Sequence, residues 1–301
     1  MNLDNGNGGK AMCQKYIIFF NPRAGDGKAQ KIADDIQKRL KIRGQDVAQL
    51  VAGGRTEAIQ MLIGELPQAK AVICIGGDGS LNAVLTAFVR AKKSVPVGLI
   101  PNGTVNNFAQ KWGIPLDQNK AFAKIMENNL HSVGIGKCAG QAVVSSLAFG
   151  SLASISNDVR QSEKKKYGLA VYGFNAVKNL RKNHSYKTEF YNDVFSMPAK
   201  VWFCLITTTD FVGGRRYLGT RSDGLHVTML NNMKFSKLLN YGYFALTGNL
   251  RKSTTLTSFD VKKLIIKTTD GKLTGTRIDG DPGPDLPVKI EWLPNFVSFF
   301  M

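Results

Sequence analysis

The amino-acid sequence predicts an α/β plus β fold, in which a doubly wound α/β domain is followed by a mainly antiparallel β-sandwich domain. With 301 residues, the chain is long enough for about two hydrophobic cores. Its first part alternates short aliphatic runs with amphipathic segments, as in parallel strands joined by helices, whereas strand-like runs separated by turns dominate beyond Leu130. We therefore predict a disordered tail over 1–14, an α/β domain over 15–130 and a β-rich domain over 131–301.

Hydrophobic periodicity places the elements of the first domain. Over residues 28–43, apolar residues recur at helical spacing with lysines and aspartates between them, which predicts a helix with one face on the sheet. Two further helices are expected over 56–63 and 81–93. Aliphatic and β-branched runs predict four strands, over 15–20, 47–51, 71–75 and 97–100.

The second domain is expected to consist mainly of strands. Amphipathic segments at 165–181 and 236–245 predict two helices that interrupt them. The longer apolar runs, bounded by turn residues, predict strands over 141–149, 200–208, 225–230, 256–267 and 288–292.

The charge of the chain favours an anionic partner. There are 40 basic and 22 acidic residues, a formal net charge of +18, which suits nucleic acid, a phosphorylated cofactor or an acidic membrane surface. The basic residues occur in short groups without the aromatic spacing of an RNA-recognition strand, so no nucleic-acid partner is expected.

The cysteine pattern and the hydropathy of the chain indicate the cellular compartment in which the protein is expected. Four cysteines are scattered without a CxxC pair, which indicates reduced thiols and not a disulfide framework or a zinc site. The N-terminus lacks the apolar stretch of a secretory signal, and no apolar run approaches the roughly 18 residues that span a bilayer. We expect a cytoplasmic protein.

Three glycine-bearing loops each follow a predicted strand of the first domain, at the sheet edge where doubly wound folds bind ligands. The first, over residues 21–28, contains Asn21, Pro22, Arg23 and Gly25. Its glycines allow backbone amides to approach a phosphate, and the following helix offers its positive N-terminus. It lacks the residue order of a Walker A loop.

The second loop places an aspartate among glycines, in the order Gly76, Gly77, Asp78, Gly79 and Ser80. The glycines permit close approach of a ligand, and Asp78 is suited to orient a nucleophile, accept its proton or hold magnesium. The alternative is a tight strand-to-helix turn capped by Ser80.

The third loop carries side chains that can hydrogen-bond phosphate or ribose, namely Gly103-Thr104 followed by Asn106 and Asn107. In their order and spacing, the three loops resemble the NPxxG, GGDGT-type and GTxND-type motifs of the diacylglycerol kinase catalytic family, which includes bacterial lipid kinases and sphingosine kinases. Segments 223–225 and 278–281 resemble the family's DG(L) and (L)DGE segments.

The resemblance implies an ATP-dependent lipid kinase that transfers the γ-phosphoryl group to the hydroxyl of a diacylglycerol-like or sphingoid lipid. ATP would lie across the three loops between a nucleotide-binding α/β domain and a lipid-substrate β domain. Either Asp78 or Asp279 would be the general base, with a slight preference for Asp279. Magnesium would be held with the help of Asp223 and Asp281. Peripheral docking on an anionic membrane is expected, and assembly into a homo-oligomer is left open.

Four positions depart from the family pattern. Asn107 replaces an aspartate of the third loop, and Gly134 replaces an aspartate that commonly begins the second domain, so negative charge is lost near the expected magnesium. Ser80 keeps the hydroxyl of the usual threonine, and Asp281 is one methylene shorter than the usual glutamate. A weak or inactive lipid- or nucleotide-binding pseudokinase therefore stays an alternative, as does an NAD kinase, which has a similar GGDG loop.

Overall fold

The computed structural model describes residues 14–22, 27–150, 185–212, 215–216, 223–231 and 256–301. The predicted tail, apart from Gln14, lies outside these residues. The helices predicted over 165–181 and 236–245 lie outside them as well.

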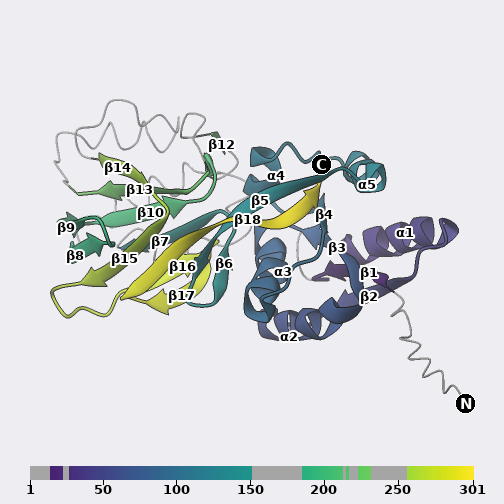
Figure 1. Cartoon of the computed structure of the whole chain (residues 1–301), viewed down its shortest axis with the longest axis horizontal. Helices are drawn as coiled ribbons and strands as arrows, with labels where there is room; N and C mark the ends of the chain where they lie inside the picture. Colours follow the sequence, from purple (N-terminus) through teal and green to yellow (C-terminus); the bar gives the residue numbers. More distant parts are fainter. Residues whose placement is uncertain (1–13, 23–26, 151–184, 213–214, 217–222, 232–255) are drawn as a thin grey trace, which may run out of the picture.

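The N-terminal half contains a parallel sheet covered by helices on both faces (Figure 1). Its strands lie in the order β2-β1-β3-β4. The strands are β1 (Lys15–Phe20), β2 (Val47–Val51), β3 (Ala69–Gly76) and β4 (Val97–Pro101). The helices are α1 (Ala29–Ile42), α2 (Arg55–Glu65), α3 (Asp78–Ala91), α4 (Asn107–Lys111) and α5 (Gln118–Glu127), and a short 3-10 helix covers Leu66–Gln68.

Alternation along β1 shows how both sheet faces are used. Ile17 and Phe19 pack in one core with α2 and α3, whereas Ile18 and Phe20 pack in another with α1 and α5. A strand that is buried on both faces reads as an uninterrupted apolar run, which is why the sequence identifies it.

The parallel sheet continues into the second half through one long strand, β18 (Val288–Phe300). Near its end β18 pairs in parallel with β4, at Phe299 and Val97. It runs antiparallel to two strands that precede it in the chain, β5 (Leu130–Cys138) and β15 (Lys263–Thr268). Figure 1 shows β18 in yellow between the two halves. The strands added here are β5 (Leu130–Cys138), β6 (Gln141–Val143), β8 (Tyr186–Tyr191), β9 (Ser196–Val201) and β15 (Lys263–Thr268).

A second sheet is antiparallel throughout, in the order β14-β13-β10-β7-β16-β17. It packs on strands β8, β15 and β18 of the first sheet around a shared core. In this core the ring centroids of Phe149 and Phe190 lie 6.3 Å apart. Its strands are β7 (Ser146–Gly150), β10 (Phe203–Thr207), β13 (Leu225–Leu230), β14 (Leu256–Val261), β16 (Gly275–Ile278) and β17 (Asp281–Asp285). Separately, β11 (Phe211–Val212) pairs antiparallel with β12 (Arg215–Arg216).

The predicted fold class, a doubly wound α/β part followed by a mainly antiparallel β-sandwich, is confirmed. Three single strands predicted from long apolar runs are each divided in the structure. The run over 200–208 spans the end of β9 in the first sheet and β10 in the second, with a break at Trp202. The run over 256–267 forms β14 in one sheet and β15 in the other, because the chain crosses between the layers at Lys262. The run over 141–149 forms β6 and β7. Domain boundaries stay a prediction, since β18 belongs to both halves.

Candidate functional site

The second and third predicted loops meet through their backbones. The amide of Asn102 donates a 3.0 Å hydrogen bond to the carbonyl of Gly76. A Cβ added at Gly103 would lie only 2.5 Å from the Cα of Gly77, so a side chain at this position would push the two loops apart. These glycines are therefore required for the approach of β3 and β4 at their carboxyl ends.

Two polar side chains of these loops are engaged in folding them. Asn106 has a left-handed backbone, with φ +57°, and its side chain bonds both the amide and the carbonyl of Gly103, at 3.1 and 2.9 Å. The Ser80 side chain packs directly on Gly76: a Cβ added at Gly76 would lie 2.3 Å from the Ser80 Oγ. Gly79 and Thr104 are exposed, and a Cβ at Gly79 would meet nothing within 4 Å, so these two positions are open to a ligand.

Asp78 joins the second loop to the helix that follows the third. Its carboxylate oxygens accept hydrogen bonds from the amides of Asn107 and Phe108, the first residues of α4, each at 3.0 Å. Among the described residues each oxygen accepts one bond, so lone pairs remain available. Burial raises the pKa of Asp78 to about 6; the nearby Asp279 adds to the rise, and the two amides oppose it. At neutral pH this carboxylate can accept a proton.

Asp279 has a different environment. It follows β16 with a left-handed backbone, φ +52°, and burial raises the pKa of its carboxyl while the surrounding donors oppose that rise. Its carboxylate is saturated, because five hydrogen bonds of 2.6–3.0 Å reach it from the side chain of Asn82, the amides of Val144, Ser145 and Ser146, and the Ser145 hydroxyl. This carboxylate therefore holds the start of β7 against α3.

The two residues predicted to bind magnesium face cations of the chain. The Asp223 carboxylate lies 3.3 Å from the Lys111 ammonium, and its backbone carbonyl accepts a hydrogen bond from Lys262. Asp281 is exposed, with its carboxylate 4.0 Å from Nε of Arg55. Within the described ranges, no three acidic, histidine or cysteine side chains gather as a metal site. Asp223 and Asp281 thus do not fit a magnesium ion in this arrangement.

Gly134, where the family carries an aspartate, has no room for a side chain. An added Cβ would lie 2.2 Å from Cζ2 of Trp292, so the indole occupies the space that an aspartate would need. At Asn107, the second position where a family aspartate is replaced, the backbone amide donates a hydrogen bond to the Asp78 carboxylate.

Two cationic side chains that lie near the candidate site residues were not identified from the sequence. Arg55, the first residue of α2, donates to Oδ1 of Asn82 and, at 3.1 Å, to Gln141, and so it lies one side chain away from Asp279. Lys111, the last residue of α4, donates to the carbonyl of Thr208 at 2.8 Å. No local motif marks either residue, because their partners come from distant parts of the chain.

The first predicted loop is described only at its ends. Asn21 is half-buried and Pro22 is exposed, and Arg23 and Gly25 lie outside the described residues. Asn21 directly follows β1, which neighbours β3 in the sheet, so it lies at the same edge as the other two loops.

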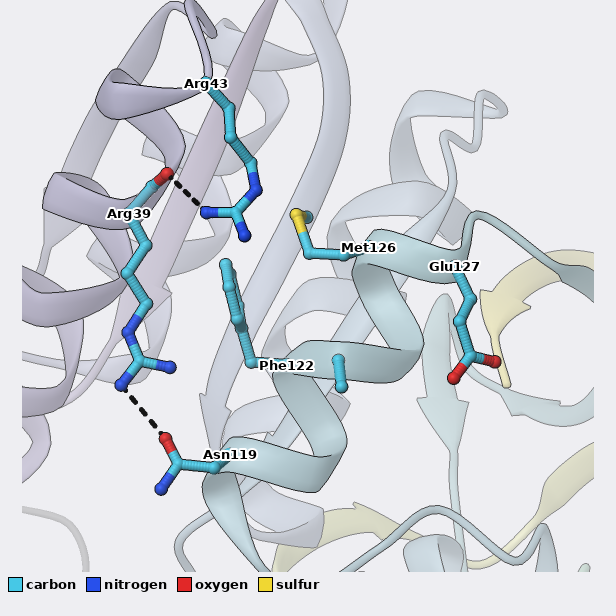
Figure 2. A pocket seen from close by; sticks show the side chains of 7 residues that line it. Arg39, Arg43, Asn119, Phe122, Met126 and Glu127 are labelled. Atoms are coloured by element: carbon cyan, nitrogen blue, oxygen red, sulfur yellow. Dashed lines mark hydrogen bonds between the residues drawn. The ribbon is translucent and has the colours of Figure 1, made fainter.

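A cavity of about 450 Å³ lies elsewhere, between α1 and α5 (Figure 2). Arg39 extends over the Phe122 ring, 5.5 Å from its centroid, and donates to Asn119, and Arg43 donates to the Arg39 carbonyl. None of the residues in the three loops lines this cavity.

Comparison with known proteins gives a family match over the part of the chain that contains the three glycine-bearing loops. Residues 15–138 match the family model described as the diacylglycerol kinase catalytic domain. This part of the chain is thus similar to the diacylglycerol kinase catalytic domain. The match covers β1 to β5 and therefore includes all three glycine-bearing loops.

Relatives of this kinase domain extend the similarity. A diacylglycerol kinase of Bacillus subtilis is 26% identical over 239 residues, 77% of this chain and 78% of its own length. One of Mycobacterium tuberculosis is 37% identical over 113 residues, 37% of this chain and 36% of its own. A crystal structure of a diacylglycerol kinase from Bacillus anthracis strain Sterne matches with a TM-score of 0.72 at 15% identity, over 95% of this chain and 96% of that one.

The match over residues 15–138 bears out the predicted resemblance, and with it the enzyme class: the chain is an ATP-dependent lipid kinase. Among the described residues, no helix is long and apolar enough to cross a membrane.

Proposed function

We propose that this kinase transfers the γ-phosphoryl group of ATP to the hydroxyl of a diacylglycerol-like lipid, with Asp78 as the general base. The observation that carries the proposal is the position of the Asp78 carboxylate. It lies where the second loop meets α4, fixed by two amides. Phosphoryl transfer needs mainly positioning and a group that orients and deprotonates the acceptor, and a carboxylate with a pKa of about 6 suits that role.

Asp78 fits the role of base better than Asp279, although the sequence slightly favoured the latter. A base must offer an open lone pair to the acceptor hydroxyl. Asp279 already accepts five hydrogen bonds, so a hydroxyl could reach it only by displacing one of them. We assign Asp279 a positioning role, in which it holds the chain around Ser145 next to α3.

The nucleotide is proposed to lie across the three loops. Gly76, Gly77, Gly79 and Ser80 would present backbone amides and the positive N-terminus of α3 to the phosphates. Thr104 is exposed beside them. Asn106 would act indirectly, by shaping the third loop around Gly103. We assign no step to a metal held by Asp223 or Asp281, because each faces a cation of the chain.

The acceptor is inferred from the relatives and from charge. The relatives from Bacillus subtilis and Mycobacterium tuberculosis are named diacylglycerol kinases, which makes diacylglycerol the first acceptor to test and a sphingoid base the second. A net charge of +18 supports peripheral docking on an anionic membrane, at roughly 1 kcal/mol for each basic residue near the surface. Such docking should weaken as salt is raised.

A lipid panel with labelled ATP tests the proposal. The full chain is incubated with vesicles that contain diacylglycerol, phosphatidylglycerol, a sphingoid base or ceramide, and with NAD in a separate reaction, and products are identified by mass spectrometry. We expect a phosphorylated diacylglycerol. Phosphorylated NAD alone would contradict the lipid acceptor, and no transfer to any acceptor would indicate a binding protein without catalytic activity.

A further inference from the structure

Lys111 lies at the C-terminal end of α4 and connects this helix to the second half of the chain. Its ammonium donates to the Thr208 carbonyl at 2.8 Å and lies 3.3 Å from the Asp223 carboxylate. Only 13% of its side chain is exposed. Thr208 directly follows β10, and Asp223 precedes β13, so both anchors lie next to the ends of neighbouring strands of the antiparallel sheet.

Two indole rings enclose the same ammonium. Nζ of Lys111 lies 4.7 Å from the centroid of Trp112 and 5.7 Å from that of Trp292. A cation held over aromatic faces and by an ion pair out of bulk water has a strongly preferred position. Burial lowers the pKa of Lys111, and the charges of Asp223 and Asp210 oppose this effect. The charge–aromatic contacts thus fix one end of α4.

The other end of α4 is fixed by Asp78, which accepts hydrogen bonds from the amides of Asn107 and Phe108. The helix has only five residues, or about 7.5 Å at 1.5 Å per residue, so a displacement at Lys111 is transmitted to these amides. Helices this short are not stable without tertiary contacts.

We propose that Lys111 is a positioning residue: it anchors α4 to the antiparallel sheet and thereby keeps the amides of Asn107 and Phe108 on the Asp78 carboxylate. The inference rests on the proposed function, in which Asp78 is the base. It adds a residue outside the glycine-bearing loops and connects the geometry of the base to the second half of the chain.

Lys262 provides a matched comparison. Its ammonium lies 5.9 Å from the same Trp292 ring and donates to the backbone carbonyl of the same Asp223. Lys262 belongs to the connection between β14 and β15, however, and among the described residues it donates no hydrogen bond to α4; its charge repels that of Lys111 and lowers the Lys111 pKa. If the local positive charge beside Asp223 were what mattered, both lysines would be needed. If the anchoring of α4 is what matters, only Lys111 is needed.

The experiment compares Lys111→Met with Lys262→Met in the full chain. Hydrogen exchange at the amides of Asn107 and Phe108 reports the contact with Asp78, and steady-state kinetics separates kcat from the KM for ATP. For Lys111→Met we expect exchange at both amides to be at least tenfold faster and kcat about 10- to 100-fold lower, with a smaller change in KM, as small misplacements of a catalytic group produce. Lys262→Met should leave amide exchange and kcat within twofold of wild type.

Unchanged exchange in Lys111→Met, or equal effects of the two substitutions, would overturn the proposal. If Lys111→Met does not fold, Lys111→Gln replaces the ammonium by a shorter, neutral amide, and wild-type exchange at Asn107 and Phe108 in that variant would also overturn the proposal. The exchange arm needs no turnover. A wild-type protein that phosphorylates no lipid would therefore contradict the proposed function without deciding the role of Lys111.

Discussion

The Asp78 carboxylate accepts a 3.0 Å hydrogen bond from the amide of Phe108, thirty residues further along the chain. This contact ties the loop after β3 to the helix that follows the loop after β4. The number of accepted hydrogen bonds distinguishes the two aspartates that the sequence predicted as candidate bases. The Asp78 carboxylate accepts two, whereas the Asp279 carboxylate accepts five and is saturated.

The pKa of Asp78 predicts how activity depends on pH. A base must be deprotonated to accept the hydroxyl proton, and burial raises the pKa of this carboxyl to about 6. We expect kcat/KM to be highest above pH 7 and to fall about tenfold per unit as pH drops below about 6. The profile is measured between pH 5 and 8.5 with the lipid well below its KM. A rate that stays constant down to pH 5 would show that no group with this pKa acts as the base.

Gly103→Ala should disturb the contact between the two loops. The added methyl group would lie 2.5 Å from the Cα of Gly77, so the backbone has to shift, at an expected cost of about 1–3 kcal/mol in the free energy of unfolding. Nucleotide affinity should fall with it. The matched control is Gly79→Ala, whose Cβ meets nothing within 4 Å, and urea denaturation compares the two. Equal stabilities would mean that the loops tolerate separation.

Asp279→Asn should lower stability as well as activity. An amide accepts hydrogen bonds only through its oxygen and directs its own N–H groups at the remaining donors, so several buried donors lose their partner. We expect a loss of about 2 kcal/mol or more in the free energy of unfolding. Asp281→Asn, at an exposed position, serves as control and should change stability by less than about 0.5 kcal/mol. A fully stable Asp279→Asn protein with no activity would return Asp279 to the role of base.

Gly134→Ala tests why this chain lacks the family aspartate. Its Cβ would lie 2.2 Å from the Trp292 indole, so this ring, which also packs on the Lys111 ammonium, has to shift. We expect a thermal midpoint several degrees below wild type, corresponding to about 1–3 kcal/mol. Adding Trp292→Leu should make the Gly134→Ala substitution nearly neutral relative to Trp292→Leu alone. Additive effects of the two substitutions would mean that the ring does not determine the residue at position 134.

The parts of the site that could be predicted from sequence are local. Strand ends followed by glycines identify the loops, because both the strand pattern and the loop lie within a few consecutive residues, and Asp78 stands out among glycines. The fold class followed in the same way from apolar periodicity. Where an apolar run continues across a change of sheet, as at Lys262, periodicity carries no signal for the crossing.

The remaining features depend on contacts between distant residues. Lys111 meets Thr208 and Asp223, 97 and 112 residues away, and Arg55 meets Gln141, 86 residues away. Asp279 was identified as a site residue by its motif. Its five hydrogen bonds, however, come from the start of β7, from the two residues before β7 and from α3. Whether a carboxylate is open or saturated is a property of the packed structure, which the sequence pattern does not contain.

The most direct test of the account is the turnover of Asp78→Asn on the preferred lipid at pH 8, measured together with ATP affinity. The substitution is nearly isosteric and removes the proton acceptor, and it leaves one of the Asn107 and Phe108 amides facing an N–H group, so exchange at both amides is followed in the same variant. The account predicts that kcat falls at least ~100-fold while the dissociation constant for ATP stays within a few-fold of wild type. Turnover close to wild type would contradict the assignment of Asp78 as the base.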